Sequence, residues 1–188
     1  MNKRNFFNNK IAIIGLGYVG LPLAVAFSKK FEVTGFDKNE ERIISLKRNI
    51  DRTQEFSKKQ IKENKLNFTC DDKKLKDINI FIIAVPTPIY NNKIPDLRNL
   101  LAATKTVSRF LKKGDLVIFE STVYPGVTDD ICIPILQKNS KLKLNHGFYC
   151  AYSPERINPG DKDKKLTNIV KVVSGSNIKT LNFVSSLY

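Results

Sequence analysis

The chain has 188 residues, of which 41% are hydrophobic and 27% charged, an ordinary globular composition that excludes a disordered chain. No apolar run reaches membrane-spanning length and no apolar signal region follows the basic N-terminus, so we expect a cytoplasmic protein with no membrane partner. The formal net charge of +14 is spread over lysines mixed with acidic residues, typical of solvated helix faces. We therefore expect no nucleic-acid partner. The alternative interpretation of the charge is a positive field that raises the encounter rate of anionic ligands such as NAD and nucleotide sugars.

Apolar runs of strand length alternate along the chain with segments of helical period, which is typical of β-α-β units. Strands are expected at residues 10–14, 32–36, 66–69, 79–85, 115–119, 148–152 and 169–173. Helices are expected at residues 19–30, 39–49, 97–112 and 127–138. Several strands are continuous β-branched or aromatic runs, as in sheets that are covered on both faces. The predicted fold class is α/β, a Rossmann-like doubly wound, mostly parallel sheet with helices on both faces.

The ends of the predicted helices carry recognisable chemistry. Asp96 is expected to cap the helix that begins at Leu97, and Gly114 is expected to follow its far end in a left-handed conformation. The last segment, residues 177–188, has the pattern of a helix that begins and is not finished. We expect a single domain over residues 1–188.

The strongest local motif is Gly-Leu-Gly-Tyr-Val-Gly at residues 15–20, between an apolar strand and a predicted helix. Gly15 permits a tight turn, Gly17 lets the backbone approach a pyrophosphate, and Gly20 lets helix and strand pack closely. The helix N-terminus offers free N–H groups to phosphates. The motif predicts NAD binding, with contacts that include Tyr18 and Val19.

The second predicted strand ends at Asp37, where a carboxylate would accept hydrogen bonds from ribose hydroxyls and repel a 2′-phosphate. NAD is therefore favoured over NADP. Arg42 lies nearby and is also predicted to bind the cofactor, although an arginine here can accommodate the additional phosphate of NADP.

Three later loops follow predicted strands, at the edge of the sheet where ligands bind in such folds. They read Val-Pro-Thr-Pro at 85–88, Ser-Thr-Val-Tyr-Pro-Gly at 121–126, and Ser-Pro-Glu-Arg-Ile-Asn-Pro-Gly at 153–160. Together with the glycine motif, in this order, they resemble the UDP-glucose/GDP-mannose dehydrogenase family from about Lys10 to the end of the chain. The third loop is most similar to the UDP-N-acetylhexosamine 6-dehydrogenases of capsule and O-antigen synthesis.

The resemblance implies an NAD-dependent oxidation of the C6 alcohol of a UDP-sugar to a carboxylate, consuming two NAD. It implies that Thr87 and Thr122 contact NAD, and that Thr122 helps to position water at the reacting carbon. Glu155 would lie beside the nicotinamide, contact substrate and activate that water as a general base. The residues implied to bind substrate are Glu155, Arg156, Ile157 and Asn158.

Other family features have no match in this sequence. The family's catalytic cysteine, which forms a thiohemiacetal, belongs to a Gly-Phe-Gly-Gly-x-Cys motif that is absent, as are the central helix and the UDP-binding domain. We therefore expect residues 1–188 to be a single NAD-binding domain, the N-terminal part of a longer enzyme. The chain alone is expected to be inactive, and the full-length form to be a homodimer or higher assembly.

The remaining reactive side chains carry no motif. Cys70, Cys132 and Cys150 are far apart in sequence and are expected to be buried, inert thiols, with neither disulfides nor a metal site. His146, the one histidine, is expected in a loop without a catalytic role.

Three other functions stay open at this point. Another NAD-dependent alcohol dehydrogenase, of the β-hydroxyacid or 6-phosphogluconate type, would share the glycine motif but lack the later loops. A noncatalytic NAD-binding module from a truncated gene would not need Glu155 and Arg156. A basic nucleic-acid-binding protein would show an affinity that falls steeply with salt.

Overall fold

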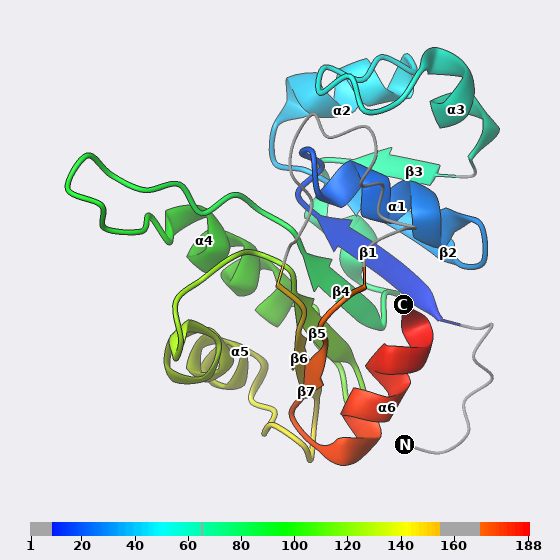
Figure 1. Ribbon diagram of the computed structural model, residues 1–188. Helices are drawn as coiled ribbons and strands as arrows, with labels where there is room; N and C mark the ends of the chain where they lie inside the picture. The colour runs from blue at the N-terminus through cyan, green and yellow to red at the C-terminus, as the bar shows by residue number, and fades with distance from the viewer. Residues whose placement is uncertain (1–8, 65, 155–169) are drawn as a thin grey trace.

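The computed structural model describes residues 9–64, 66–154 and 170–188, which are built around a seven-stranded sheet (Figure 1). The strands are β1 (Lys10–Ile14), β2 (Glu32–Phe36), β3 (Leu66–Thr69), β4 (Ile80–Ile83), β5 (Leu116–Phe119), β6 (Tyr149–Tyr152) and β7 (Ser174–Gly175). Their order is β3-β2-β1-β4-β5-β6-β7. All neighbours pair in parallel except β6 and β7. This order reverses between β1 and β4, as in doubly wound dinucleotide-binding folds, and confirms the predicted fold class.

The register of the sheet aligns the ends of its strands. Ile14 at the end of β1 pairs with Phe36 of β2 and with Ile83 of β4. Ile83 in turn pairs with Phe119 of β5, which pairs with Tyr152 of β6. The loops that follow these five strands therefore emerge side by side at one edge of the sheet.

Helices cover both faces of the sheet, which explains why β4 and β5 are apolar and buried along their whole length. One face packs against α1 (Gly20–Ser28), α2 (Glu40–Lys47), α3 (Lys58–Glu63) and α6 (Ile178–Leu187). The opposite face packs against α4 (Arg98–Ser108), the π-helical segment η3 (Val127–Cys132) and α5 (Ile133–Ser140). Figure 1 shows α4 and α5 on one side of the strands and α1 and α6 on the other.

Side chains along the strands point alternately into the hydrophobic cores on the two faces of the sheet. In β1, Ile11 and Ile13 are fully buried against the α1 side, while Ala12 and Ile14 pack toward α4. Burial of large aliphatic side chains of this kind contributes roughly 1.5–3 kcal/mol each to stability. The sheet is therefore a rigid support for the loops at its edge.

The last predicted strand was placed wrongly. The structure has β7 at Ser174–Gly175, antiparallel to β6, instead of a strand at 169–173, of which residue 169 lies outside the described residues. The apolar side chains of Val170 and Val172 misled the prediction, since both are exposed.

The predicted helices exist, but their ends differ. The helix expected at 127–138 begins with the π-helical η3 and continues as α5 to Ser140. Two elements were missed, α3 and the short 3-10 helix η2 (Asp72–Leu75), because their lysine-rich sequences lack an apolar period. The segment 177–188 is helical, as expected, from Ile178.

Of the two predicted helix-end residues, Asp96 differs from expectation and Gly114 has the expected left-handed conformation. Leu97, not Asp96, occupies the N-cap position of α4, and Asp96 instead accepts hydrogen bonds from the backbone and guanidinium of Arg98. Arg98 lowers the pKa of Asp96 to about 2 through these bonds. Gly114 does adopt a positive φ of 94°, but α4 ends earlier, at Ser108. No helix among the described residues is both long and apolar enough to span a membrane.

Candidate functional site

The three motif glycines form the turn between β1 and α1, and each is glycine for a different reason. Gly15 has a φ of +93°, and a Cβ there would lie 2.9 Å from the carbonyl oxygen of Ala84. At Gly20 a Cβ would lie 1.8 Å from the carbonyl oxygen of Gly15, so helix and turn touch directly. A Cβ at Gly17 would meet nothing within 4 Å. The fold therefore requires Gly15 and Gly20, whereas the small size of Gly17 leaves open space for something else to approach the backbone.

Asp37, the residue after β2, reaches back to this turn. One carboxylate oxygen accepts a hydrogen bond from the backbone N–H of Leu16 at 2.9 Å, and the other accepts from the N–H of Asn39 at 2.9 Å. The capping side chain of α2 is Asn39, not Asp37. Asp37 is only partly buried and lines a hollow beside the turn, so its carboxylate is accessible to a ligand.

Arg42 of α2 lies behind the same turn and is 8% exposed. Its Nε donates to the carbonyl oxygen of Leu16 at 2.8 Å, and its Nη1 lies 2.9 Å from Oδ1 of Asp51. Burial tends to raise the pKa of Asp51, but hydrogen bonds from Thr53 and Arg42 outweigh it, so that the pKa is lowered. Arg42 Nη2 is buried without a hydrogen-bond partner among the described residues, next to the hollow that Arg42 helps to line.

The first hollow, called here the α4-side hollow, has a volume of about 460 Å³ and lies between the turn and α4. Its lining combines the turn and the Asp37 carboxylate with small side chains of α4, which leave room for a flat group. These α4 residues are Asn99, Ala102, Ala103 and Thr106. The N–H groups at the start of α1, the carboxylate and the apolar floor suit the phosphate, ribose and base of a nucleotide.

The second hollow, called the β5-side hollow, has a volume of about 370 Å³ and shares Gly17, Val85 and Pro86 with the first. It brings together Tyr18, Thr87 and Thr122, which are far apart in sequence. The two hollows thus form a continuous surface that crosses the sheet edge at Gly17. A dinucleotide has this shape, two nucleotides joined at a pyrophosphate.

The loops after β4 and β5 hold each other at the second hollow. The Thr87 hydroxyl donates to the carbonyl oxygen of Thr122 at 2.6 Å, and the Ser121 hydroxyl donates to the carbonyl oxygen of Val85 at 2.6 Å. The sequence therefore predicted correctly that these two loops lie at the same edge of the sheet. Glu120, directly before them, is fully buried, lines the same hollow, and was not singled out from the sequence.

Tyr18 and Val19 complete the motif. Tyr18 is 40% exposed on the β5-side hollow, whereas Val19 is largely buried in the core beneath it. The Tyr18 side chain is therefore exposed enough to contact a ligand, whereas Val19 could contact one only through its backbone.

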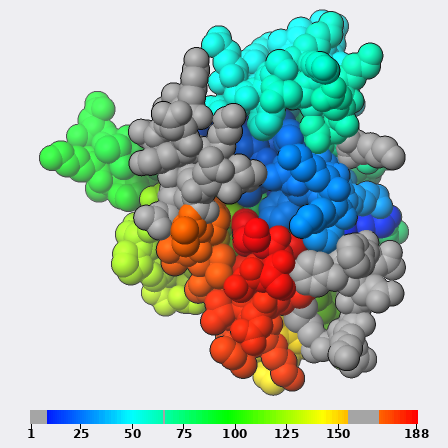
Figure 2. Space-filling view, turned by 45° about the vertical axis from the view of Figure 1, so that its right-hand side comes forward, coloured from blue at the N-terminus to red at the C-terminus, as the bar shows by residue number. Residues whose placement is uncertain are grey.

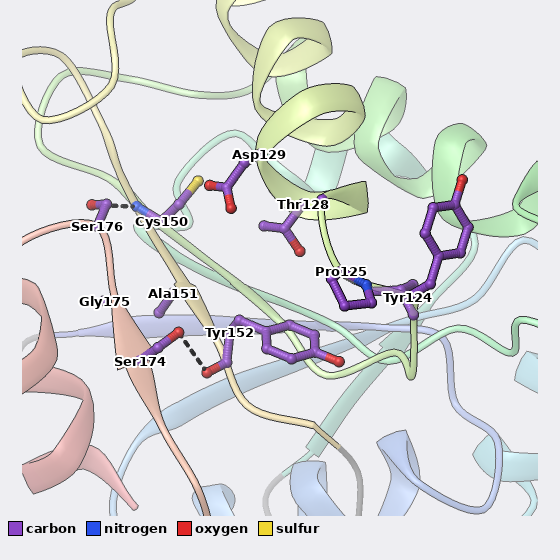
Figure 3. A pocket seen from close by; sticks show the side chains of 12 residues that line it. Tyr124, Pro125, Thr128, Asp129, Cys150, Ala151, Tyr152, Ser174, Gly175 and Ser176 are labelled. Atoms are coloured by element: carbon purple, nitrogen blue, oxygen red, sulfur yellow. Dashed lines mark hydrogen bonds between the residues drawn. The ribbon is translucent and has the colours of Figure 1, made fainter.

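A third hollow, called the β7-side hollow, lies beyond the loop after β5 (Figure 3). It has a volume of about 440 Å³ and is lined from η3 by Thr128 and Asp129, and from β6 by Cys150 and Tyr152. Burial raises the pKa of the Cys150 thiol strongly, so this sulfur is not an activated nucleophile.

The other reactive side chains lie elsewhere. Cys132 is buried and its pKa is raised by burial, as expected for an inert thiol, but Cys70 is exposed, so the expectation of three buried cysteines was wrong for this one. It follows the short edge strand β3, which covers it poorly. His146 is an exposed turn residue before β6, at the opposite end of the strands from the loops.

The predicted substrate-binding residues Glu155, Arg156, Ile157 and Asn158 lie outside the described residues. Ser153, two residues before Glu155, is fully buried, and its backbone N–H donates to the carbonyl oxygen of Phe119, at the end of β5, at 2.9 Å. Sequence patterns did not reveal Asp51, which pairs with Arg42 behind the turn, or Glu120, which lines the β5-side hollow, because neither belongs to a recognisable motif.

Comparison with known proteins identifies the family. Residues 9–188 match the NAD binding domain of the UDP-glucose/GDP-mannose dehydrogenase family. The chain is 51% identical over 180 residues to UDP-N-acetyl-D-glucosamine 6-dehydrogenase of Pseudomonas aeruginosa, covering 95% of this chain and 43% of that protein. It is 48% identical over 181 residues to Protein CapL of Staphylococcus aureus, covering 96% and 43%.

A solved structure supports the same family assignment. The UDP-D-ManNAc dehydrogenase of Pyrococcus horikoshii superposes with a TM-score of 0.87 and 34% sequence identity, over 95% of this chain and 44% of that one. The chain therefore spans less than half the length of the relatives it matches. It belongs to the UDP-glucose/GDP-mannose dehydrogenase family, within which it corresponds to the NAD-binding domain.

Proposed function

We propose that NAD, the cofactor of the family's domain, binds across Gly17, with its adenosine in the α4-side hollow and its nicotinamide in the β5-side hollow. The open space at Gly17 is the observation that carries this proposal, because packing does not explain a glycine there. The α1 N-terminus would hold the pyrophosphate. Asp37 would accept from the ribose hydroxyls, and Arg42 would support it from behind while fixing Leu16.

We infer that the reaction is the oxidation of the C6 alcohol of a UDP-N-acetylhexosamine or UDP-hexose to the uronate, for surface polysaccharide synthesis. Support comes from the name of the 51% identical relative and from the motif loops at the sheet edge. The chain would act in the cytoplasm as one domain of a longer enzyme, a homodimer or higher assembly.

Bound NAD supplies the hydride acceptor, and two NAD serve the four-electron oxidation. The residues of this chain orient the reactants. Thr87 fixes the backbone of Thr122, which leaves the Thr122 side chain to position water at the reacting carbon. Glu155 is proposed as the general base for that water, and the substrate contacts are assigned to Glu155, Arg156, Ile157 and Asn158.

Calorimetric titration of the chain with NAD and with NADP tests the cofactor part. We expect saturable NAD binding that is tighter than NADP binding. An assay of NADH formation from UDP-N-acetylglucosamine in the same preparation tests whether the chain acts alone, and turnover would contradict the expectation that it is inactive by itself. NAD binding without turnover would fit a cofactor-holding domain that needs its second domain, whereas binding of neither nucleotide would refute the assignment of the hollows.

A further inference from the structure

A cluster of three side chains lies beneath the loop that lines the β5-side hollow. Its centre is Glu120, whose side chain is fully buried. One carboxylate oxygen accepts from Lys171 Nζ at 2.6 Å, and the other accepts from the Tyr188 hydroxyl. The Lys171 ammonium also lies 5.4 Å from the centre of the Tyr188 ring, within the range of a cation–π contact.

The cluster joins parts of the chain that are far apart in sequence. Glu120 follows β5, Lys171 precedes β7, and Tyr188 lies at the end of α6. The Tyr188 ring also packs edge-on against Phe27 of α1, with ring centres 5.5 Å apart. In Figure 2, α6 lies between the segment that leads to β7 and the α1 region. One buried carboxylate thus ties the β5 loop to β7, α6 and, through Tyr188, α1.

The ion pair between Lys171 and Glu120 is strengthened by its burial. The Lys171 side chain is 8% exposed and that of Glu120 is 0% exposed, so water screens their attraction poorly. Glu120 is followed at once by Ser121 and Thr122, whose contacts to the β4 loop hold the other side of the hollow. The position of the Thr122 segment is therefore set from two sides, by the β4 loop and by the cluster.

We propose that the Lys171–Glu120–Tyr188 cluster positions the Glu120–Thr122 loop against the nicotinamide half of NAD. This inference rests on the proposed placement of NAD. Glu120 is a positioning residue, since its oxygens are engaged by Lys171 and Tyr188 and it acts through the loop that follows it. The adenosine half of the site lies in the other hollow and does not depend on the cluster.

The test compares NAD with ADP-ribose, which lacks only the nicotinamide, by calorimetry on the 188-residue chain. The variants are Glu120→Gln and the double variant Glu120→Gln/Lys171→Met, which leaves no isolated buried charge and so keeps the fold. We expect both to weaken NAD binding by about tenfold, the effect of one well-placed hydrogen bond, while ADP-ribose affinity stays within about twofold. Lys171→Arg, which keeps the charge, should retain most of the NAD affinity.

Asp115→Asn is the matched control. Asp115 is 1% exposed, precedes the same strand β5 at its other end, and accepts from the backbone N–H of Lys112 at 2.7 Å. This variant should lose stability, measured as Tm, but keep its affinities for NAD and ADP-ribose. Equal losses for both ligands in the Glu120 variants, or no loss for either, would overturn the inference. A wild-type chain that binds neither ligand would overturn the placement of NAD itself, a separately recognisable failure.

Discussion

Replacing Gly17 with alanine should change NAD affinity without lowering the stability of the fold. The added methyl group would meet no atom within 4 Å, and the backbone at Gly17 is not left-handed. Gly→Ala changes at compatible sites stabilise proteins by about 0.4–1 kcal/mol, because the unfolded chain loses freedom. We therefore expect Gly17→Ala to unfold at the same temperature as the wild type or slightly higher.

The same methyl group would occupy the space where the two hollows meet. A pyrophosphate held by the N–H groups of the turn must approach the backbone there, so the variant has to bind NAD with a displaced phosphate or lose it. We expect NAD affinity to fall by at least about 100-fold, equivalent to ~2.7 kcal/mol. Calorimetry gives the affinity, and thermal unfolding without ligand gives the stability.

Gly20→Ala is the control with the opposite expectation. Its methyl group would overlap the carbonyl oxygen of Gly15 at 1.8 Å, and overpacking of this kind costs about 1–3 kcal/mol or more. Its unfolding temperature should drop clearly. A Gly17→Ala variant that is stable and binds NAD like the wild type would refute the placement of the pyrophosphate at Gly17.

Three further predictions concern other side chains of the domain. Asp37→Ala should weaken NAD binding by about tenfold, because charge-assisted hydrogen bonds to the ribose are lost. The ratio of NAD affinity to NADP affinity should also fall, and calorimetry measures both affinities. The pKa of Asp51 is lowered in the fold, so its stabilisation is present above its unfolded value of 3.8 and is lost as pH falls through the lower folded pKa. Asp51→Asn would leave the buried Arg42 guanidinium without its ion-pair partner, which should cost about 3 kcal/mol of stability at pH 7. The acid unfolding curve of the variant should be flatter than that of the wild type, and an unchanged curve would contradict this role of Asp51. Iodoacetamide should alkylate the exposed Cys70 in the native chain and spare the two buried thiols, as peptide mass spectrometry would show; rapid labelling of all three would contradict their burial.

The sequence predicted the strands of the N-terminal half of the sheet well. β1, β2 and β3 have the predicted bounds, and β1 and β2 end where the sequence indicates, at the glycine turn and at Asp37. The last strand was harder to predict. β7 is two residues long and depends on pairing with β6, and neither Ser174 nor Gly175 has strand propensity.

The site shows the same division between local and long-range information. Gly15, Gly17 and Gly20 were recognisable because they stand at a fixed spacing between a strand and a helix. The meeting of Thr87 and Thr122 followed from the rule that parallel strands end at one edge of the sheet. Asp51 and Glu120 could not be found in this way. Their roles depend on partners such as Arg42 and Lys171 that only the tertiary fold brings near.

The most direct test of the account is an NMR titration of the isotope-labelled chain with NAD. We predict saturable shifts in the amides of the turn at 15–20, of Asp37, and of the loops that contain Thr87 and Thr122, with little change around Asp129 and Ser176 of the β7-side hollow. Shifts confined to the β7-side hollow, or no saturable shifts at all, would contradict the claim that NAD binds across Gly17.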